Sequence, residues 1–300
     1  MSKVSRQSPV WLVGSAGMLA GDILEELHKA DFPCVISDRE VDITDINQVR
    51  AFIGQRHPAW IINAAAYTAV DQAEKETESA FAINGLGPGV LGAVAAQTGA
   101  TIVHFSTDYV FDGSGDRPWV ETDSTGPLSV YGRSKLDGER RLAEATDRYF
   151  TFRISWLYGV RGKNFVKTMV RLFREKPELR VISDQIGGPT WARGLARNIA
   201  ALVTNGKGNP GIYHYSDAGY ISWFDFAVGI RDAALAVGAI DREISILPIP
   251  TSEYSLPAPR PANSRFSHDK VRNQLGFNVL PWRSNLDAFF REWKALDFRP

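Results

Sequence analysis

The amino-acid sequence predicts an α/β fold in which a doubly wound parallel sheet is followed by a smaller C-terminal lobe. Three observations support this prediction. Strand-like and helix-like segments alternate through the first half of the chain, a glycine-rich turn follows the first apolar run, and the alternation loosens after residue 155. Segments that alternate in this way build a parallel sheet with helices on both faces.

Short apolar runs indicate the buried strands, and amphipathic or helix-favouring stretches indicate the helices between them. We expect strands at residues 10–13, 34–37, 60–64, 101–106 and 150–154. We expect helices at residues 21–30, 46–55, 74–82, 87–98 and 131–145, with helical spacing again at 165–174 and 191–204.

The stretch 247–264 separates two parts of the chain. It contains five prolines, at positions 248, 250, 257, 259 and 261, and proline does not continue a regular helix. We therefore expect extended chain that crosses between two lobes. Residues 1–155 should form a dinucleotide-binding domain to which later segments return, and residues 156–300 should form mainly the second, substrate-binding lobe.

The composition is that of an ordinary globular protein, since 34 basic residues balance 34 acidic ones. A nucleic-acid-binding protein usually carries a basic face, so we expect no nucleic-acid partner. The single Cys34 excludes an intramolecular disulfide and favours the cytoplasm. No apolar run approaches the roughly 20 residues of a membrane span, and the five histidines lack metal-ligand spacing, so we expect neither a membrane partner nor a metal.

The first expected strand runs into Gly14-Ser-Ala-Gly-Met-Leu-Ala20 and then into a helix. Small residues at this spacing let the backbone approach a pyrophosphate, which binds the N–H groups at the helix N-terminus. This context predicts a Rossmann-type sheet, although an ordinary strand-to-helix turn gives a similar pattern. The expected cofactor contacts are Gly14, Ser15, Ala16, Gly17, Met18 and Leu19.

The residues after the second expected strand bear on the choice of cofactor. Asp38 ends that strand and Arg39 follows it. An acidic residue here binds the ribose hydroxyls of NAD, whereas an arginine accepts the 2′-phosphate of NADP, so the pair leaves the choice open. Asp42 and Ile43 are placed to border the adenine, although a solvated turn and a helix start beside Thr44 explain them equally well.

Tyr131 and Lys135 stand four residues apart in an expected helix, so their side chains share one face. A phenol ionises near pH 10, and we expect the Lys135 ammonium to lower the pKa of Tyr131. Thr107 follows a buried strand at the sheet edge where ligands of such folds bind. An acid and a hydrogen-bond donor suit carbonyl reduction. A tyrosine and a lysine at this spacing also occur by chance on helix surfaces, so the glycine loop and the strand end are needed to support the prediction.

Longer motifs make the combination recognisable. They include Ser106-Thr-Asp-Tyr-Val-Phe-Asp-Gly113, Tyr131-Gly-Arg-Ser-Lys135 and Asp184-Gln-Ile-Gly-Gly-Pro-Thr190, with further segments at 63–74, 153–158, 164–166 and 260–264. Over nearly its whole length the chain resembles the extended short-chain dehydrogenase/reductases, and among them the dTDP-4-dehydrorhamnose reductases.

This resemblance implies a catalytic triad of Thr107, Tyr131 and Lys135. The expected reaction is the reduction by NADPH, with NADH possible, of the 4-keto group of dTDP-4-dehydro-L-rhamnose to give dTDP-L-rhamnose. The resemblance also implies that the cofactor is bound by Ala64, Ala65, Ala66 and Thr68 together with Tyr131 and Lys135, and the sugar by Thr107, Asp108, Tyr109, Tyr131 and Trp156. Three alternatives remain: a related sugar-nucleotide 4-ketoreductase, a regulatory subunit that binds dinucleotide without turnover, and a sugar epimerase or dehydratase whose cofactor stays bound and is recycled.

Two arginines carry separate expectations. Arg260 is a candidate for the diphosphate of a dTDP-sugar substrate, because a guanidinium binds phosphate oxygens as a fork, although a solvated surface arginine is nearly as good an explanation. Some members of the family bridge two subunits through magnesium held by acidic residues, and Arg193 stands at one of those positions. A cation repels the metal, so we expect no magnesium-bridged dimer and leave monomer and homodimer open.

Overall fold

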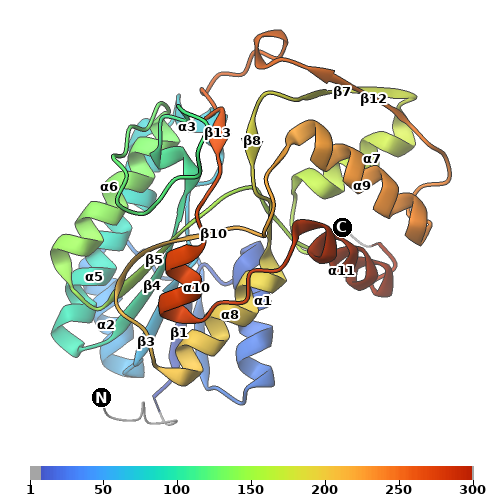
Figure 1. Cartoon of the computed structure of the whole chain (residues 1–300). Coiled ribbons are helices and arrows are strands. Elements are labelled where there is room, and N and C mark those ends of the chain that lie inside the picture. Colours follow the sequence, from blue (N-terminus) through green and yellow to red (C-terminus); the bar gives the residue numbers. More distant parts are fainter. Residues whose placement is uncertain (1–7, 299–300) are drawn as a thin grey trace.

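The computed structural model describes residues 8–298, so the ends of the two expected domains, residues 1–7 and 299–300, lie outside the described residues. Figure 1 shows a sheet lobe and a smaller second lobe. The larger sheet has six strands in the order β10-β5-β4-β3-β1-β2, and every neighbouring pair is parallel. The strands are β1 (Val10–Val13), β2 (Cys34–Ser37), β3 (Trp60–Asn63), β4 (Thr101–Thr107), β5 (Tyr149–Ile154) and β10 (Gly211–Tyr215). The predicted doubly wound α/β fold is confirmed.

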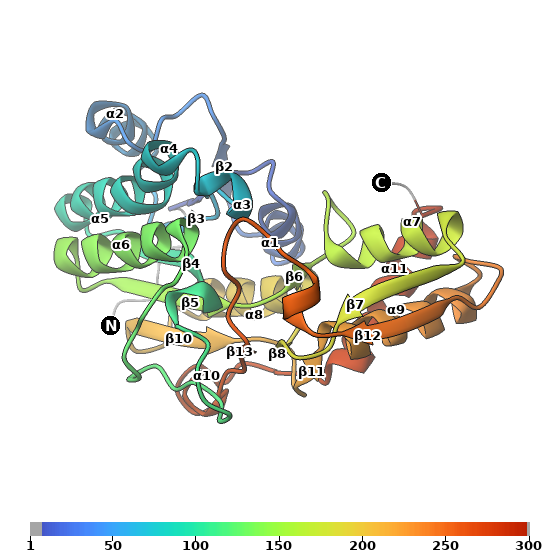
Figure 2. The same cartoon turned by 90° about the horizontal axis from the view of Figure 1, so that it is seen from above.

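Helices cover both faces of this sheet, as Figure 2 shows from above. Helices α1 (Met18–Lys29) and α8 (Ala192–Asn205) pack together over one face, and α2 (Ile46–Arg56), α5 (Gly87–Thr98) and α6 (Val130–Ala145) lie over the other. Each face has its own hydrophobic cluster: Ile23 and Ile199 belong to the first, and Ile53 and Leu142 to the second. The sheet is thus buried on both sides, which explains why its strands read as continuous apolar runs.

The strand order reverses between β1 and β3, because the chain proceeds from β1 to one neighbour and then crosses back to the other. Ligands of open α/β sheets bind outside the carboxyl ends of the strands at such a reversal. Gly14 follows β1 and Ala64 follows β3, so the topology brings the glycine loop and the alanine-rich segment to the same place.

One helical region corrects two predictions. Residues 74–82 were expected to form one helix, but they begin with a turn that follows α3 (Val70–Ala73). Helix α4 (Thr77–Phe81) comes next and continues through a π-helical turn, η1 (Ala82–Leu86), into α5. The result is one helix, Thr77–Thr98, whose 22 residues contain a stretch that is long and apolar enough, by length and composition only, for a membrane span. The prediction that no apolar run approaches that length was wrong. The α5 part of this helix packs against α6 and α2, and a buried core helix of a sheet protein is apolar for that reason.

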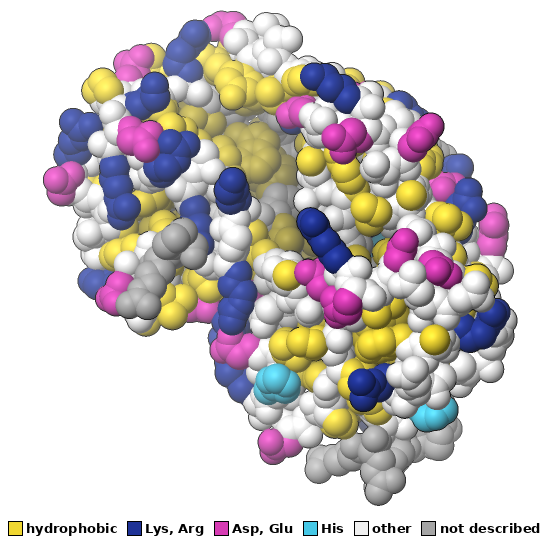
Figure 3. All heavy atoms as spheres, turned by 180° about the vertical axis from the view of Figure 1, so that it is seen from behind, with side chains coloured by type: hydrophobic (Ala, Val, Ile, Leu, Met, Phe, Trp, Pro, Cys, Tyr) yellow, Lys and Arg dark blue, Asp and Glu magenta, His cyan; other side chains and the backbone are white. Residues whose placement is uncertain are grey.

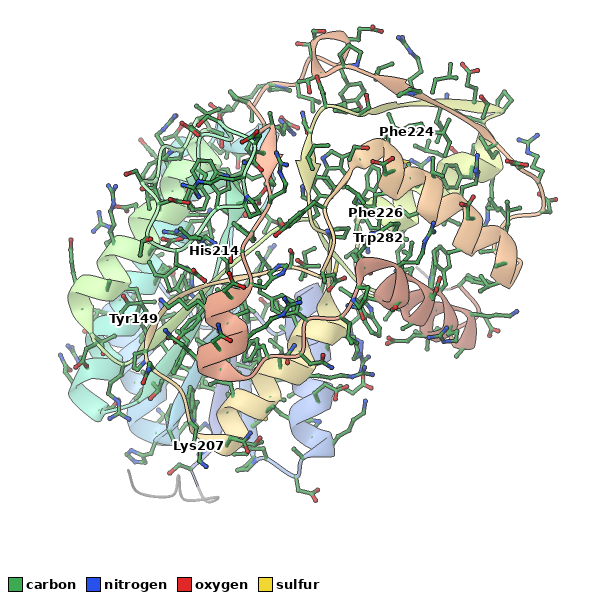
Figure 4. The ribbon with its side chains drawn as sticks, in the orientation of Figure 1. Tyr149, Lys207, His214, Phe224, Phe226 and Trp282 are labelled. Atoms are coloured by element: carbon green, nitrogen blue, oxygen red, sulfur yellow. The ribbon has the colours of Figure 1, made fainter. Side chains whose placement is uncertain are left out.

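The second lobe consists of three helices and a two-stranded parallel ribbon. The helices are α7 (Phe165–Glu175), α9 (Trp223–Val237) and α11 (Trp282–Ala295), and the ribbon pairs β7 (Glu178–Ile182) with β12 (Ser245–Ile249). Aromatic rings form much of its core, and Figure 4 labels Phe226 and Trp282, whose rings meet edge to face at 6.0 Å. The lobe therefore has a hydrophobic cluster of its own.

Short elements connect the two lobes. Two small sheets, β6 (Leu157–Tyr158) with β9 (Thr190–Trp191), and β11 (Ile221–Ser222) with β8 (Ile186–Gly187) and β13 (Asn263–Ser264), lie between them, and α10 (Asp269–Leu275) packs on β10. The proline-rich stretch begins within β12, makes a single 3-10 turn, η3 (Thr251–Glu253), and crosses back to the sheet lobe. There the N–H of Asn263 donates to the carbonyl of Gly113 at 3.0 Å.

Candidate active site

A cavity of about 560 Å³ opens at the carboxyl ends of the sheet strands, and Figure 3 shows the surface hollowed between the two lobes. The structure brings twelve of the predicted site residues together around it. They are Gly17, Met18, Leu19, Ala64, Ala66, Thr68, Thr107, Asp108, Tyr109, Tyr131, Lys135 and Trp156. Residues from the start of α1, the segment after β3, β4, α6 and the segment after β5 thus meet at one place.

The glycine loop has the geometry that a pyrophosphate requires. Gly14 adopts φ +72°, and a Cβ atom there would stand 2.6 Å from the backbone nitrogen of Ala65, which no real Cβ tolerates. Gly17 precedes the first turn of α1, and that turn contains no acidic residue. Free N–H groups and the helix dipole therefore face the cavity without a competing carboxylate, so these residues fit the phosphates of a dinucleotide.

The predicted adenine side lies beyond the cavity wall. Asp38 is half-buried and Arg39 is exposed, so both remain available to a ligand. The carboxylate of Asp42 accepts hydrogen bonds from the N–H and the hydroxyl of Thr44, and Ile43 is buried. Gly14, Ser15, Ala16 and Ala65 likewise contribute to the loops behind the cavity and not to its lining.

Helix α6 places the proposed catalytic pair. The hydroxyl of Ser129 accepts a hydrogen bond from the N–H of Gly132 at 3.1 Å and caps the helix immediately before Tyr131. One turn later, Lys135 is 2% exposed, and its ammonium donates to the backbone carbonyl of Phe105 at 2.6 Å. Burial lowers the pKa of Lys135 to about 8, against the attraction of Glu139, which raises it.

The expected effect of Lys135 on Tyr131 is absent. Burial raises the pKa of Tyr131 to about 12, the charge of Asp108 raises it further, and only a hydrogen bond with Thr107 acts to lower it. The prediction that Lys135 lowers this pKa was wrong for a geometric reason, since the ammonium is held by the carbonyl of Phe105 on β4. Helical spacing places two side chains on one face but does not determine which partner each one binds.

Thr107 and Asp108 form a hydrogen-bonded unit at the end of β4. The Thr107 hydroxyl donates to Asp108 Oδ1 at 3.0 Å, and the Ser264 hydroxyl donates to Asp108 Oδ2 at 2.5 Å. Burial raises the pKa of Asp108 to about 6, although both hydroxyls lower it. Asp108 therefore joins the sheet lobe to β13 and holds Thr107 in place. The ring of Tyr109 meets that of Tyr131 edge to face at 5.5 Å.

Trp156 forms the wall toward the second lobe. Its backbone adopts φ +49°, a conformation that is strained for a bulky residue and that concentrates at ligand sites. Its indole stacks on that of Trp223 with ring centroids 3.7 Å apart. The sequence analysis missed Trp223, because 67 residues of chain separate the two rings and no local pattern connects them. It also missed Lys163, which lines the same cavity and whose basic side chain beside a helix start was a usable signal.

The structure pairs Arg260 with a carboxylate and not with the cavity. Its guanidinium makes a fork to Asp71, with contacts of 2.6 and 2.8 Å, and it is absent from the cavity lining. Asp71 also accepts from the N–H of Ala258 at 3.1 Å. To meet a substrate diphosphate, Arg260 would have to exchange this partner.

Arg193 occupies the middle of an acidic cluster. It contacts Asp22 at 3.1 Å, Glu25 at 2.7 Å, Glu26 at 3.1 Å and Glu292 at 2.7 Å. The guanidinium thus lies where its positive charge neutralises neighbouring carboxylates. Between residues 8 and 298, no group of three or more His, Cys, Asp or Glu side chains has an arrangement that could hold a metal ion.

Comparisons with known proteins agree with this geometry. Residues 8–295 match the family described as the RmlD substrate binding domain. A curated dTDP-4-dehydrorhamnose reductase from Burkholderia thailandensis is 40% identical over 283 residues, which cover 91% of this chain and 95% of that protein.

Solved structures give the same result. A dTDP-4-dehydrorhamnose reductase from Clostridium acetobutylicum is similar with a TM-score of 0.89 at 35% identity. One from Bacillus anthracis, in complex with NADP, is similar with a TM-score of 0.88 at 38% identity. Each comparison covers 95% of this chain and 99% of the other. The chain therefore belongs to the RmlD substrate-binding-domain family, and its relatives include curated dTDP-4-dehydrorhamnose reductases.

Proposed function

We propose that this protein is an NADPH-dependent reductase that converts dTDP-4-dehydro-L-rhamnose into dTDP-L-rhamnose. The main support for the proposal is that the start of α1, Thr107, Tyr131 and Lys135 all line the same cavity. Membership of the family supports the choice of reaction, and the relative solved with NADP supports the choice of cofactor.

The sheet lobe would hold the cofactor. Gly14–Leu19 would bind its pyrophosphate. The adenosine end would be bound by Asp38, Arg39, Asp42 and Ile43, and the small side chains that pass beneath the cofactor are those of Ala64, Ala65, Ala66 and Thr68. Bound NADPH supplies the hydride. Lys135, buried and positively charged at neutral pH, would attract the negatively charged dinucleotide and donate to its hydroxyls.

Tyr131 is the proposed proton donor. With a pKa of about 12 the phenol keeps its proton at neutral pH, and a donor must be protonated to act. An alkoxide is a stronger base than the phenolate of Tyr131, so proton transfer from Tyr131 to the former carbonyl oxygen is downhill. Thr107 would hold the same oxygen after turning its hydroxyl away from Asp108, and hydrogen bonds to developing charge are strong in a dry site.

The substrate would lie toward the second lobe. Tyr109 and Asp108 would contact the sugar from the sheet side, and Trp156 would offer it a flat face. Arg260 would bind the diphosphate once it leaves Asp71. In this assignment residues 1–155, with α8 and β10, form the cofactor lobe, and the rest of 156–300 forms mainly the substrate lobe.

The decisive experiment supplies purified protein with dTDP-4-dehydro-L-rhamnose and either NADPH or NADH. We expect loss of the absorbance of the reduced nicotinamide in equal amount to the sugar consumed, with dTDP-L-rhamnose as the product. Faster turnover of another dTDP-4-keto sugar would identify the related ketoreductase instead. Binding of NADPH without turnover of any such sugar would indicate the regulatory subunit.

The Tyr131→Phe variant tests the acid. Removal of the phenol hydroxyl should lower kcat by on the order of 10²–10⁴, the usual contribution of a general acid. NADPH binding, measured by the fluorescence of the bound cofactor, should persist in this variant, because the glycine loop and Lys135 remain. Wild-type turnover in this variant would contradict the assignment of Tyr131.

A further inference from the structure

We propose that Glu139 is a positioning residue that keeps Lys135 protonated, and that it thereby sets the pH range over which the protein binds NADPH. Arg153 acts as the opposing charge that limits this effect. The inference rests on the proposed use of Lys135 as a cofactor ligand. Glu139 does not line the cavity, so it acts on the cofactor through neighbours that do: Lys135, whose charge it favours, and Ser106, which donates to it.

Helix α6 presents three groups on one face. Tyr131, Lys135 and Glu139 follow each other at intervals of four residues, which places them in a row. Lys135 and Glu139 are 2% and 3% exposed. Glu139 is the carboxylate that acts on Lys135 and favours its charged form. Its attraction is little screened, because both side chains are buried.

Glu139 belongs to a buried network that fixes its position. Arg153 on β5 contacts it as a fork, with Nη2 to Oε2 at 2.7 Å and Nε to Oε1 at 3.0 Å. The hydroxyl of Ser106 donates to the same carboxylate. The guanidinium of Arg153 also lies 5.0 Å from the ring centroid of Phe111. The carboxylate therefore cannot rotate away from Lys135 without breaking several contacts.

Among the described residues, Glu139 is the charge that acts on Lys135, and the other groups nearby are neutral or have partners of their own. On β4, burial and the charge of Lys135 hold the pKa of His104 well below its usual range, so this ring is neutral. On β10, the ring of His214, labelled in Figure 4, lies 3.4 Å from Arg153 Nη1, and burial keeps it neutral as well. Asp108 is occupied by Thr107 and Ser264, and the direct partner of Lys135 is the uncharged carbonyl of Phe105. The charge of Lys135 thus depends on Glu139, which Arg153 holds in place.

Removing one charge should have a different effect from removing both. In Glu139→Gln the buried Arg153 remains without a partner and repels the ammonium, so the pKa of Lys135 should fall by about 1–3 units. In the double variant Glu139→Gln with Arg153→Gln both charges are gone, and the pKa should return toward that of the wild type. A network with only a packing role would make the double variant at least as impaired as the single one.

The measurement is the Kd of NADPH, followed by cofactor fluorescence between pH 6 and pH 10. Wild-type affinity should weaken with a midpoint near pH 8, where Lys135 loses its proton. The midpoint should move to lower pH by about 1–3 units in Glu139→Gln and move back in the double variant. Lys135→Gln should remove this step, which assigns it to Lys135. Asp137→Asn is the matched control, since Asp137 lies on the same helix but pairs with the exposed Arg141.

The outcomes separate this inference from the proposed function. A protein that does not bind NADPH at any pH would overturn the proposed function. A protein that binds NADPH with the same midpoint in wild type and Glu139→Gln would overturn the role of Glu139 alone. If Glu139→Gln does not fold, because it leaves a buried guanidinium unpaired, the double variant decides: a midpoint further from the wild type than about 3 units, or no step at all, contradicts the proposal.

Discussion

Gly14 is the position in the glycine loop that tolerates a side chain least. Both its φ of +72° and the contact with Ala65 forbid a side chain. Gly14→Ala should therefore be destabilised by about 1–2 kcal/mol through its backbone conformation and should also lose NADPH binding, because the loop must shift. Gly99→Ala is the matched control, with φ +74° but nothing within 4 Å. Thermal unfolding and NADPH titration check both, and unchanged NADPH affinity in Gly14→Ala would contradict the assignment of this loop.

For single residues, the sequence predicted which side chains lie together better than it predicted their pKa values and their hydrogen-bond partners. Spacing and strand ends brought Thr107, Tyr131 and Lys135 to one cavity, because backbone periodicity and sheet topology control where side chains emerge. The sequence could not predict the pKa of Tyr131 or the partner of Arg260. They depend on burial and on Asp71, a carboxylate 189 positions away along the chain, which no local pattern reveals.

The first turn of α6 links helix capping to catalysis. Ser129 is 1% exposed and caps the turn that carries Tyr131. Ser129→Ala should cost about 1 kcal/mol of stability and, by loosening this turn, should lower kcat by up to about tenfold. Asp45→Ala removes the cap of α2, which carries none of the proposed catalytic residues, and should lower Tm without changing kcat. If the two variants have equal kcat values, the Ser129 cap does not contribute to catalysis.

The sequence predicted best the elements that consist of a continuous apolar run or have a glycine or proline at their boundary. The strands 10–13 and 34–37 and the helix 87–98 have the observed bounds, because aliphatic runs and glycine or proline boundaries are local signals. Strand β10 was missed since its sequence, Gly-Ile-Tyr-His-Tyr, is broken by a buried histidine that hydrogen-bonds within the core. The two-residue strands between the lobes are formed by tertiary contacts, and their sequences contain no periodic pattern.

Across the whole molecule, Arg193 connects the two lobes. It lies on α8 and contacts three carboxylates on α1 and one on α11. Arg193 and Asp22 are buried, with side chains 5% and 1% exposed, whereas Glu25 is 39% exposed. The second lobe is therefore attached to the sheet lobe by charge as well as by packing, through residues that do not line the cavity.

Arg193→Gln should consequently destabilise the protein in a pH-dependent way. Removing one partner of a buried pair costs about 3–5 kcal/mol, and we expect the lower end because Glu25 is well solvated. A hydrogen bond from Arg193 lowers the pKa of Glu25 to about 2. Burial raises the pKa of Glu26, but hydrogen bonds from Lys29 and then Arg193 lower it below its usual value. A lowered carboxyl pKa stabilises the fold above its unfolded value of about 4.5, and this stabilisation is lost as the pH falls toward 2. The wild type therefore loses the benefit of Arg193 in acid, while the variant has none to lose. Arg193 also opposes the effect of burial on Asp22, which raises its pKa to about 6, so part of the benefit of Arg193 is already lost as Asp22 takes up a proton. The difference in Tm between the two proteins should be large at pH 7, begin to shrink near pH 6 and shrink further below pH 4.5. A difference that stays constant across this range would show that Arg193 acts by packing alone.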